Sequence, residues 1–226
     1  MKTAATAFLL LAGIACGAAV SAPDAIRDRI IADASSLSPA SLAFDRTTVG
    51  LQVGGGTRTV INRVERWDGK VWTLISVDGK PPSAAHIREQ AKRNASLPVP
   101  GYHRLAFLLA AGAVRSTDDL GRTLLTIPRL PANSIVNEGT DISAHLKAEA
   151  VVGNANGLPW VQRLTLTANE PFKLSWVLKV LTFEQVNEYR LDSSGKPRLM
   201  AQANDSAGTM FGISGGQKSE VTYAYR

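Results

Sequence analysis

The last third of the chain, residues 160–226, constrains the fold most, because strand-like segments follow one another there almost without interruption. In its first segment, Trp160, Leu164 and Leu166 share one face at a period of two, opposite polar side chains. Apolar and polar residues alternate again in residues 218–225. Further strand-like segments lie between these two, at residues 176–189, 198–203 and 209–213. The short polar spacers between them, including residues 204–208 and 214–216, predict an antiparallel meander.

The composition of the whole chain fits one globular domain. At 226 residues it is long enough for one sizeable core, and its 45% hydrophobic and 19% charged content is ordinary. The net charge of +6 is modest and scattered. Its densest basic group, Arg88, Lys92 and Arg93, indicates a solvated helix face or, second, a site for anionic head groups. We therefore expect a single domain over residues 23–226 and no nucleic-acid partner.

Residues 1–22 have the form of a secretory signal peptide, with Lys2 before an uncharged segment and small residues after it. Cleavage after Ala22 and cleavage after Ala19 both fit the small-residue rule. A third option is a lipoprotein signal cut between residues 15 and 16, which would make Cys16 the acylated first residue. Cys16 is the only cysteine, so no disulfide is expected within the mature chain. The apolar run is shorter than the about 20 residues of a membrane span.

The middle of the chain predicts a mixture of strands and helices. Helical spacing is found at residues 24–37, 83–95 and 102–111, the last apolar nearly all round. Strands are predicted at residues 42–53, 60–67, 70–77, 123–127 and 145–152, and residues 128–139 form an irregular connection. Asp68 and Gly69 predict a two-residue hairpin turn. These elements indicate an α+β, mainly β protein.

Motifs that would indicate catalysis or metal binding have weak context. Ser214 stands in a G-x-S-x-G pattern, but no histidine follows it, so we interpret this segment as a glycine-rich turn. His86, His103 and His145 lie in unrelated predicted elements without the spacing of a metal site. We therefore predict no catalytic residue, no metal site and no cofactor.

Apolar side chains offer a more specific expectation. Leu105, Leu108 and Leu109 belong to the apolar helix, which must be buried or must line a cavity beside the sheet. Trp72 and Trp176 lie on predicted strands, where packing in the core is the usual role of tryptophan. We name these five residues as candidate contacts of a hydrophobic ligand.

Three segments give the chain a family resemblance: the hairpin VERWDGKVWTL at residues 64–74, the strand VQRLTLT at 161–167 and the ending VTYAYR at 221–226. With the signal peptide and the early helix, they resemble the lipoprotein-carrier superfamily of bacterial envelopes, the LolA/LolB-like proteins and relatives such as the sigma-factor regulator RseB. The resemblance covers most of the mature chain as a pattern, and no functional residue of the family can be matched. It implies a strongly curved antiparallel sheet, an unclosed β-barrel, with helices covering its concave face.

The resemblance also implies a function. We expect a non-enzymatic protein of the Gram-negative periplasm that holds a lipid or a lipoprotein acyl chain between an apolar sheet face and the helices. Anchoring to the outer membrane through Cys16 is a variant of this hypothesis, and otherwise any membrane contact would be peripheral. An alternative is a regulatory module with a packed core that binds another envelope protein. A serine hydrolase using Ser214 is a distant alternative.

Overall fold

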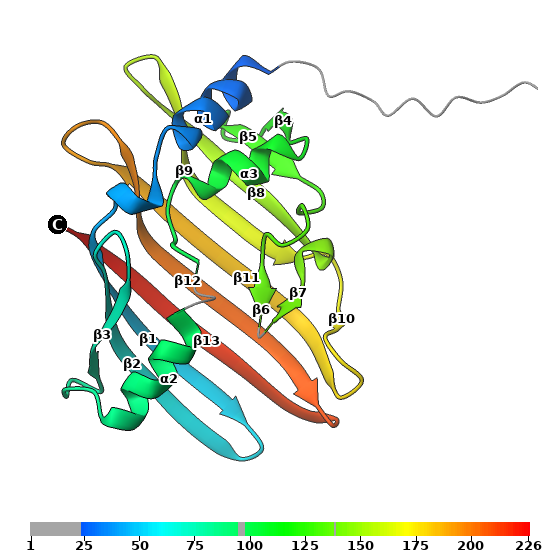
Figure 1. Ribbon diagram of the computed structural model, residues 1–226. Helices are drawn as coiled ribbons and strands as arrows, with labels where there is room; N and C mark the ends of the chain where they lie inside the picture. Colours follow the sequence, from blue (N-terminus) through cyan, green and yellow to red (C-terminus); the bar gives the residue numbers. More distant parts are fainter. Residues whose placement is uncertain (1–23, 95–97, 138) are drawn as a thin grey trace, which may run out of the picture.

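One large antiparallel sheet that does not close into a barrel dominates the computed structural model, and helices cover its concave face (Figure 1). The structure describes residues 24–94, 98–137 and 139–226. The expected signal peptide, its cut sites and Cys16 lie outside the described residues. The mainly β fold class predicted from the sequence is confirmed.

Three α-helices and two short 3-10 helices accompany thirteen strands along the described chain. The helices are α1 Ala25–Ser35, η1 Pro39–Ser41, α2 Ala84–Asn94, α3 Arg104–Ala110 and η2 Ser143–His145. The first seven strands are β1 Phe44–Gly54, β2 Thr57–Trp67, β3 Trp72–Val77, β4 Val114–Thr117, β5 Thr123–Ile127, β6 Val136–Asn137 and β7 Thr140–Asp141. The last six are β8 Leu146–Ala155, β9 Leu158–Ala168, β10 Phe172–Lys173, β11 Leu178–Leu191, β12 Pro197–Met210 and β13 Ile213–Tyr225.

The order of the strands brings the two ends of the domain together. The main sheet runs β3-β2-β1-β13-β12-β11-β9-β8-β5-β4, with β10 added beside β11, while β6 and β7 form a separate hairpin. Strand β1 pairs with β13 in register from Phe44 opposite Tyr225 to Gly54 opposite Gly215. The first hairpin of the domain therefore docks on its last strand.

The concave face has two differently covered halves (Figure 1). Helices α1 and α3 pack on each other and on the β5–β8–β9 half, where Leu125, Val161 and Leu164 are fully or almost fully buried. Helix α2 lies beside β3 at the other half. There an aromatic cluster is built around Phe44, whose ring meets Trp72 edge to face at a centroid distance of 5.6 Å.

The C-terminal meander is antiparallel as predicted, but its turns lie elsewhere, and residues 209–213, predicted to be a strand, contain the turn between β12 and β13. Residues 204–208, expected to form a turn, lie within the continuous strand β12, and residues 214–216 lie within β13. The actual turn is Phe211 and Gly212, which both have positive φ. Asn204 and Ser206 are residue types common in turns. In the structure they lie two positions apart on β12, where they pair with Ser219 and Gln217 of β13.

Two details of register also differ from the sequence expectation. Strand β9 has an irregularity opposite Val151 and Val152 that turns Val161 into the core, while Trp160 is half-buried beside it. The loop between β2 and β3 has four residues, because Trp67 pairs with Trp72. The side chain of Asp68 closes this loop by accepting hydrogen bonds from two backbone N–H groups at 2.9 Å.

Candidate functional site

A cavity of about 240 Å³ lies between the concave face of the sheet and the segments that cover it. It is bounded by α3, by the segment that precedes α3, by the start of the β6–β7 hairpin and by strands β1, β9, β11, β12 and β13. The cavity therefore occupies the place where the family resemblance predicts a ligand. Its lining is mixed in character, whereas the sequence predicted an apolar one.

The apolar part of the lining comes from both sides of the cavity. Leu164 and Leu166 of β9 and Leu199 of β12 form its floor, because they occupy inward positions on the two strands that flank β11. Leu108 of α3 and Ile135 beside the β6–β7 hairpin form part of its cover. This part can accommodate a hydrocarbon group at a gain of about 25 cal/mol for each Å² of apolar surface removed from water.

A belt of amides and hydroxyls forms the polar part of the lining. Gln185 and Asn187 face inward from β11, and the Gln185 side chain donates to Asn187 at 3.1 Å. On the adjacent strands the Tyr223 hydroxyl donates to Gln202 at 3.2 Å, and Gln202 donates in turn to Asn204 at 3.1 Å. We call Gln185, Asn187, Gln202 and Tyr223 the amide belt. These side chains bond one another within the sheet, and their remaining donors and acceptors can serve a polar group in the cavity.

Arg46 at the edge of the cavity is already neutralised by the protein. Its guanidinium donates to the Glu65 carboxylate at 2.6 and 3.1 Å and lies 4.2 Å from the centre of the Trp72 ring. Arg63 lies 3.9 Å from the same carboxylate and donates to Gln90 of α2 at 2.7 Å. The Arg63–Gln90 hydrogen bond therefore attaches α2 to the sheet, and Glu65 offsets the charge of Arg46 at the edge of the cavity.

Arg104, the first residue of α3, is a lining cation of a different kind. Its guanidinium donates to the backbone carbonyl oxygen of Ser134 at 2.7 Å, and no carboxylate among the described residues forms an ion pair with it. Burial lowers the pKa of Arg104 below its usual value, because the charged form loses hydration. Burial, and then the charge of Arg104, also lower the pKa of the adjacent His103, so that its ring is neutral at pH 7. A partly desolvated cation that pairs with no described carboxylate is suited to bind an anion.

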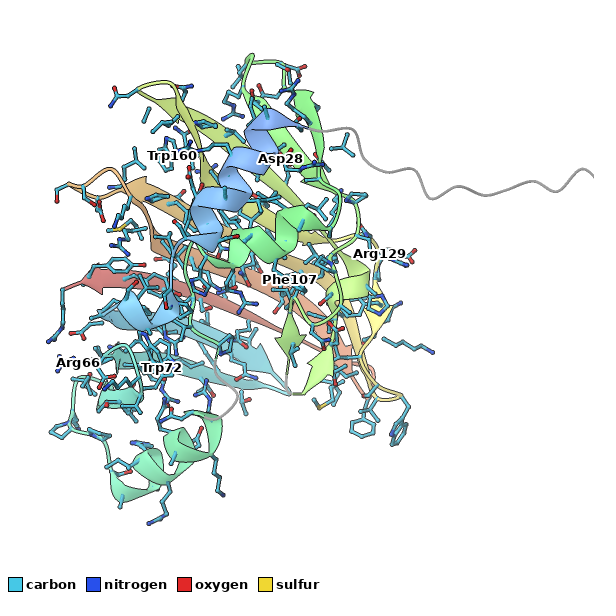
Figure 2. All side chains as sticks on the ribbon, turned by 45° about the horizontal axis from the view of Figure 1, so that its top comes forward. Asp28, Arg66, Trp72, Phe107, Arg129 and Trp160 are labelled. Carbon is cyan, nitrogen blue, oxygen red and sulfur yellow. The ribbon has the colours of Figure 1, made fainter. Side chains whose placement is uncertain are left out.

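The five residues named from the sequence do not come together in one site. Leu108 lines the cavity, whereas Leu105 and Leu109 on the same helix are fully buried in the adjoining core. Trp72 is buried beneath Arg46 on the β1–β3 side, well apart from Phe107 of α3 (Figure 2). Trp176 is 88% exposed, in a bend before β11 rather than on a strand.

Sequence reasoning missed the amide belt and Arg104. The belt left a signal, since polar residues recur at a period of two at positions 185 and 187 and again at 202 and 204. The role of Arg104 depends on contacts far along the chain, and nothing in its neighbourhood in sequence indicates them.

The residues considered for catalysis and metal binding stay apart. Ser214 is exposed near the tip of the β12–β13 hairpin. His86 is on α2, His103 precedes α3, and His145 stacks on Phe172 with 4.3 Å between the ring centres. Within the described part of the chain, no group of three or more His, Cys, Asp or Glu side chains could hold a metal ion.

Comparison with known proteins found no match among protein-family models, curated proteins or solved structures. Among the described residues, no helix is long and apolar enough to cross a membrane.

Proposed function

We propose that this is a non-enzymatic envelope protein that binds an amphipathic, acidic lipid in the cavity under α3. The observation that supports this most is the mixed lining of the cavity, in which Arg104 and the amide belt lie among leucines of α3 and of the sheet. The hydrocarbon part of the ligand lies against Leu108, Leu164 and Leu166. Its acidic head group accepts hydrogen bonds from Arg104.

The energetics of such binding need no special motif. Each buried CH₂ group contributes about 0.8 kcal/mol. A carboxylate or phosphate gains charge-assisted hydrogen bonds from a guanidinium that has already lost part of its hydration. The cavity of about 240 Å³ lies just below the usual range of ligand pockets, about 300–1,000 Å³, so it suits one acyl segment better than a whole lipid.

The form of residues 1–22 and the resemblance to lipoprotein carriers support a place in the bacterial periplasm. They also support lipids and lipoprotein acyl chains as the natural source of the ligand. With Cys16 acylated, the protein would act from the membrane surface, and without acylation it would act as a carrier in solution.

Occupancy of the cavity can be tested first. Native mass spectrometry of protein purified from cells should show co-purified lipid, and Leu108→Trp should reduce binding of a fluorescent fatty acid at least about tenfold by filling the cavity. The matched control is Phe107→Trp on the same helix, since Phe107 points to solvent and is 54% exposed. Equal binding by both variants, or a bare mass without lipid, would contradict a ligand in this cavity and favour the packed regulatory module.

Recognition of the head group can be tested separately. Arg104→Gln should weaken binding of a fatty acid about tenfold and leave binding of its uncharged methyl ester nearly unchanged, since only the acid pairs with the guanidinium. Arg129→Gln is the control, because Arg129 also donates to a backbone carbonyl, that of Ala144 at 3.2 Å, but lies on the surface (Figure 2). If acid and ester lose affinity equally, the role of Arg104 is structural.

A further inference from the structure

One end of the sheet carries an exposed apolar cluster that the cavity does not explain. Trp176 is 88% exposed and Phe211 is 68% exposed, and their rings meet edge to face at a centroid distance of 5.7 Å. Met210 and Ile213, paired across the β12–β13 turn, are more than half exposed beside them. We call Trp176, Met210, Phe211 and Ile213 the apolar tip. Clustered large apolar side chains on a surface indicate an interaction site.

The apolar tip is held rigidly by the backbone of two hairpins. The Phe211 N–H donates to the carbonyl oxygen of Val177 at 2.9 Å, which joins the β12–β13 turn to the segment before β11. The segment before β11 forms a turn of its own, because the Leu174 N–H donates to the carbonyl oxygen of Leu178 at 2.9 Å. The backbone positions that carry the two aromatic rings are therefore held close to each other, which reduces the entropy lost on binding.

The backbone at Phe211 gives independent support for a role of this side chain. Phe211 has φ +51° in a turn whose second residue is Gly212, at φ +79°. The equivalent positions of two other turns in this sheet are occupied by Asp78 and Asn156, residue types that tolerate this conformation. A bulky aromatic residue there is unfavourable, and such outliers are found where function requires the side chain.

The charged residues nearest to the apolar tip along the chain are lysines. Lys173 and Lys179 are the only charged residues in the segments 171–181 and 206–217. They lie opposite each other on β10 and β11. The neighbouring turn between β1 and β2, residues 52–60, adds Arg58 and no acidic residue. An apolar cluster beside these cations is complementary to an anionic lipid surface.

We propose that the apolar tip docks the protein on the surface of a bilayer that contains anionic phospholipid. Trp176 and Phe211 enter the interfacial region, where aromatic rings are favoured, and Lys173 and Lys179 contact head-group phosphates. A groove of about 620 Å³ on the same end of the sheet, lined by Leu178, Val180 and Met210, begins beside the tip. Docking would therefore place an apolar surface of the protein directly against the lipid. This inference does not depend on a ligand in the cavity under α3.

Vesicle binding tests the proposal directly. The protein should co-sediment with vesicles of phosphatidylethanolamine and phosphatidylglycerol, and much less with vesicles of phosphatidylcholine alone. The double variant Trp176→Ser, Phe211→Ser should bind at least about tenfold more weakly, as expected for losing two large apolar side chains. Leu120→Ser is the control, because Leu120 is 77% exposed at the β4–β5 turn.

The role of charge is tested by Lys173→Glu together with Lys179→Glu, which should reduce binding to the anionic vesicles at least about tenfold. Lys196→Glu, in the exposed β11–β12 turn, should have little effect. Binding of a fatty acid in solution should be unchanged in all these variants, so this proposal and the proposed function can fail separately.

Three outcomes would overturn the docking proposal. They are the absence of vesicle binding by the unaltered protein, equal loss of binding in the tip and control variants, and a dimer in solution that the Trp176→Ser, Phe211→Ser change dissociates. The last outcome would assign the tip to an interface between two copies of the chain.

Discussion

Glu65 is a carboxylate that the sheet encloses together with two guanidinium groups. It is 2% exposed, pairs with Arg46 at 2.6 Å and lies 3.9 Å from Arg63. Taking these charges out of water is costly, and their mutual contacts compensate only while all partners are present.

Replacement of Glu65 by glutamine should therefore lower the free energy of unfolding by about 3 kcal/mol, because two cations would remain without their counterion. Denaturant unfolding measures this loss. The control is Asp205→Asn, which breaks the exposed pair of Asp205 with Lys218 at 2.7 Å and should cost less than about 1 kcal/mol. Similar losses of unfolding free energy in both variants would show that the buried ion pair stabilises the protein no more than the exposed one.

At this scale the sequence predicted only part of the site. Leu108 lines the cavity as expected of an apolar helix, but the periodicity that selected it selected Leu105 and Leu109 equally. Which of the three faces the cavity depends on the rotation of α3 against α1 and the sheet, and that is fixed by tertiary packing. The roles of Arg46 and Arg104 depend in the same way on Glu65 and Ser134, which lie 19 and 30 residues away in the chain.

At the scale of elements, hairpin turns separate what sequence can and cannot predict. Asn156 and Gly157 form a turn with positive φ at both residues, between the strands predicted at residues 145–152 and from residue 160 onward, and both residue types favour such a turn. The Phe211–Gly212 turn has the same pattern of φ, but the sequence did not predict it, because a phenylalanine does not indicate a turn. The turn was instead predicted at residues 204–208, because this part of β12 is rich in residue types that are common in turns.

Strain at the β12–β13 turn gives a prediction at this scale. Phe211→Asn and Phe211→Ala both remove the ring, but asparagine tolerates positive φ better than alanine. The asparagine variant should thus be more stable to denaturant than the alanine variant by about 0.5–1 kcal/mol. Both should lose vesicle binding equally. If the two variants unfold at the same denaturant concentration, the turn is not strained at Phe211.

At the scale of the whole molecule, the first and last strands along the chain, β1 and β13, pair in the middle of one sheet. Alternating patterns predicted an antiparallel, mainly β architecture, because each strand carries its own signal. The pairing of β1 with β13 joins residues more than 150 positions apart, and no local pattern specifies it. The resemblance to lipoprotein carriers implied a curved, unclosed sheet where local reasoning could not.

Asp45 stabilises this junction and gives it a dependence on pH. From β1 it accepts hydrogen bonds from Arg66 of β2 at 2.8 and 3.1 Å and from Arg226, just after β13, at 2.8 Å. The hydrogen bond from Arg66 is the main cause that lowers the pKa of Asp45 to about 2, and Arg226 lowers it further. Since the folded state prefers the ionised form, the stabilisation is complete well above the unfolded pKa of about 3.9 and is lost as the pH falls through about 2.

Asp45→Asn should therefore lower the free energy of unfolding by about 1 kcal/mol at pH 7, a modest value because the junction is partly exposed. The difference from the unaltered protein should shrink between about pH 5 and pH 2 and vanish below that range. Denaturant unfolding at a series of pH values measures it, with Asp119→Asn in the exposed β4–β5 turn as the control. Parallel stability curves for Asp45→Asn and the unaltered protein would mean that this carboxylate does not couple the closure of β1 onto β13 to protonation.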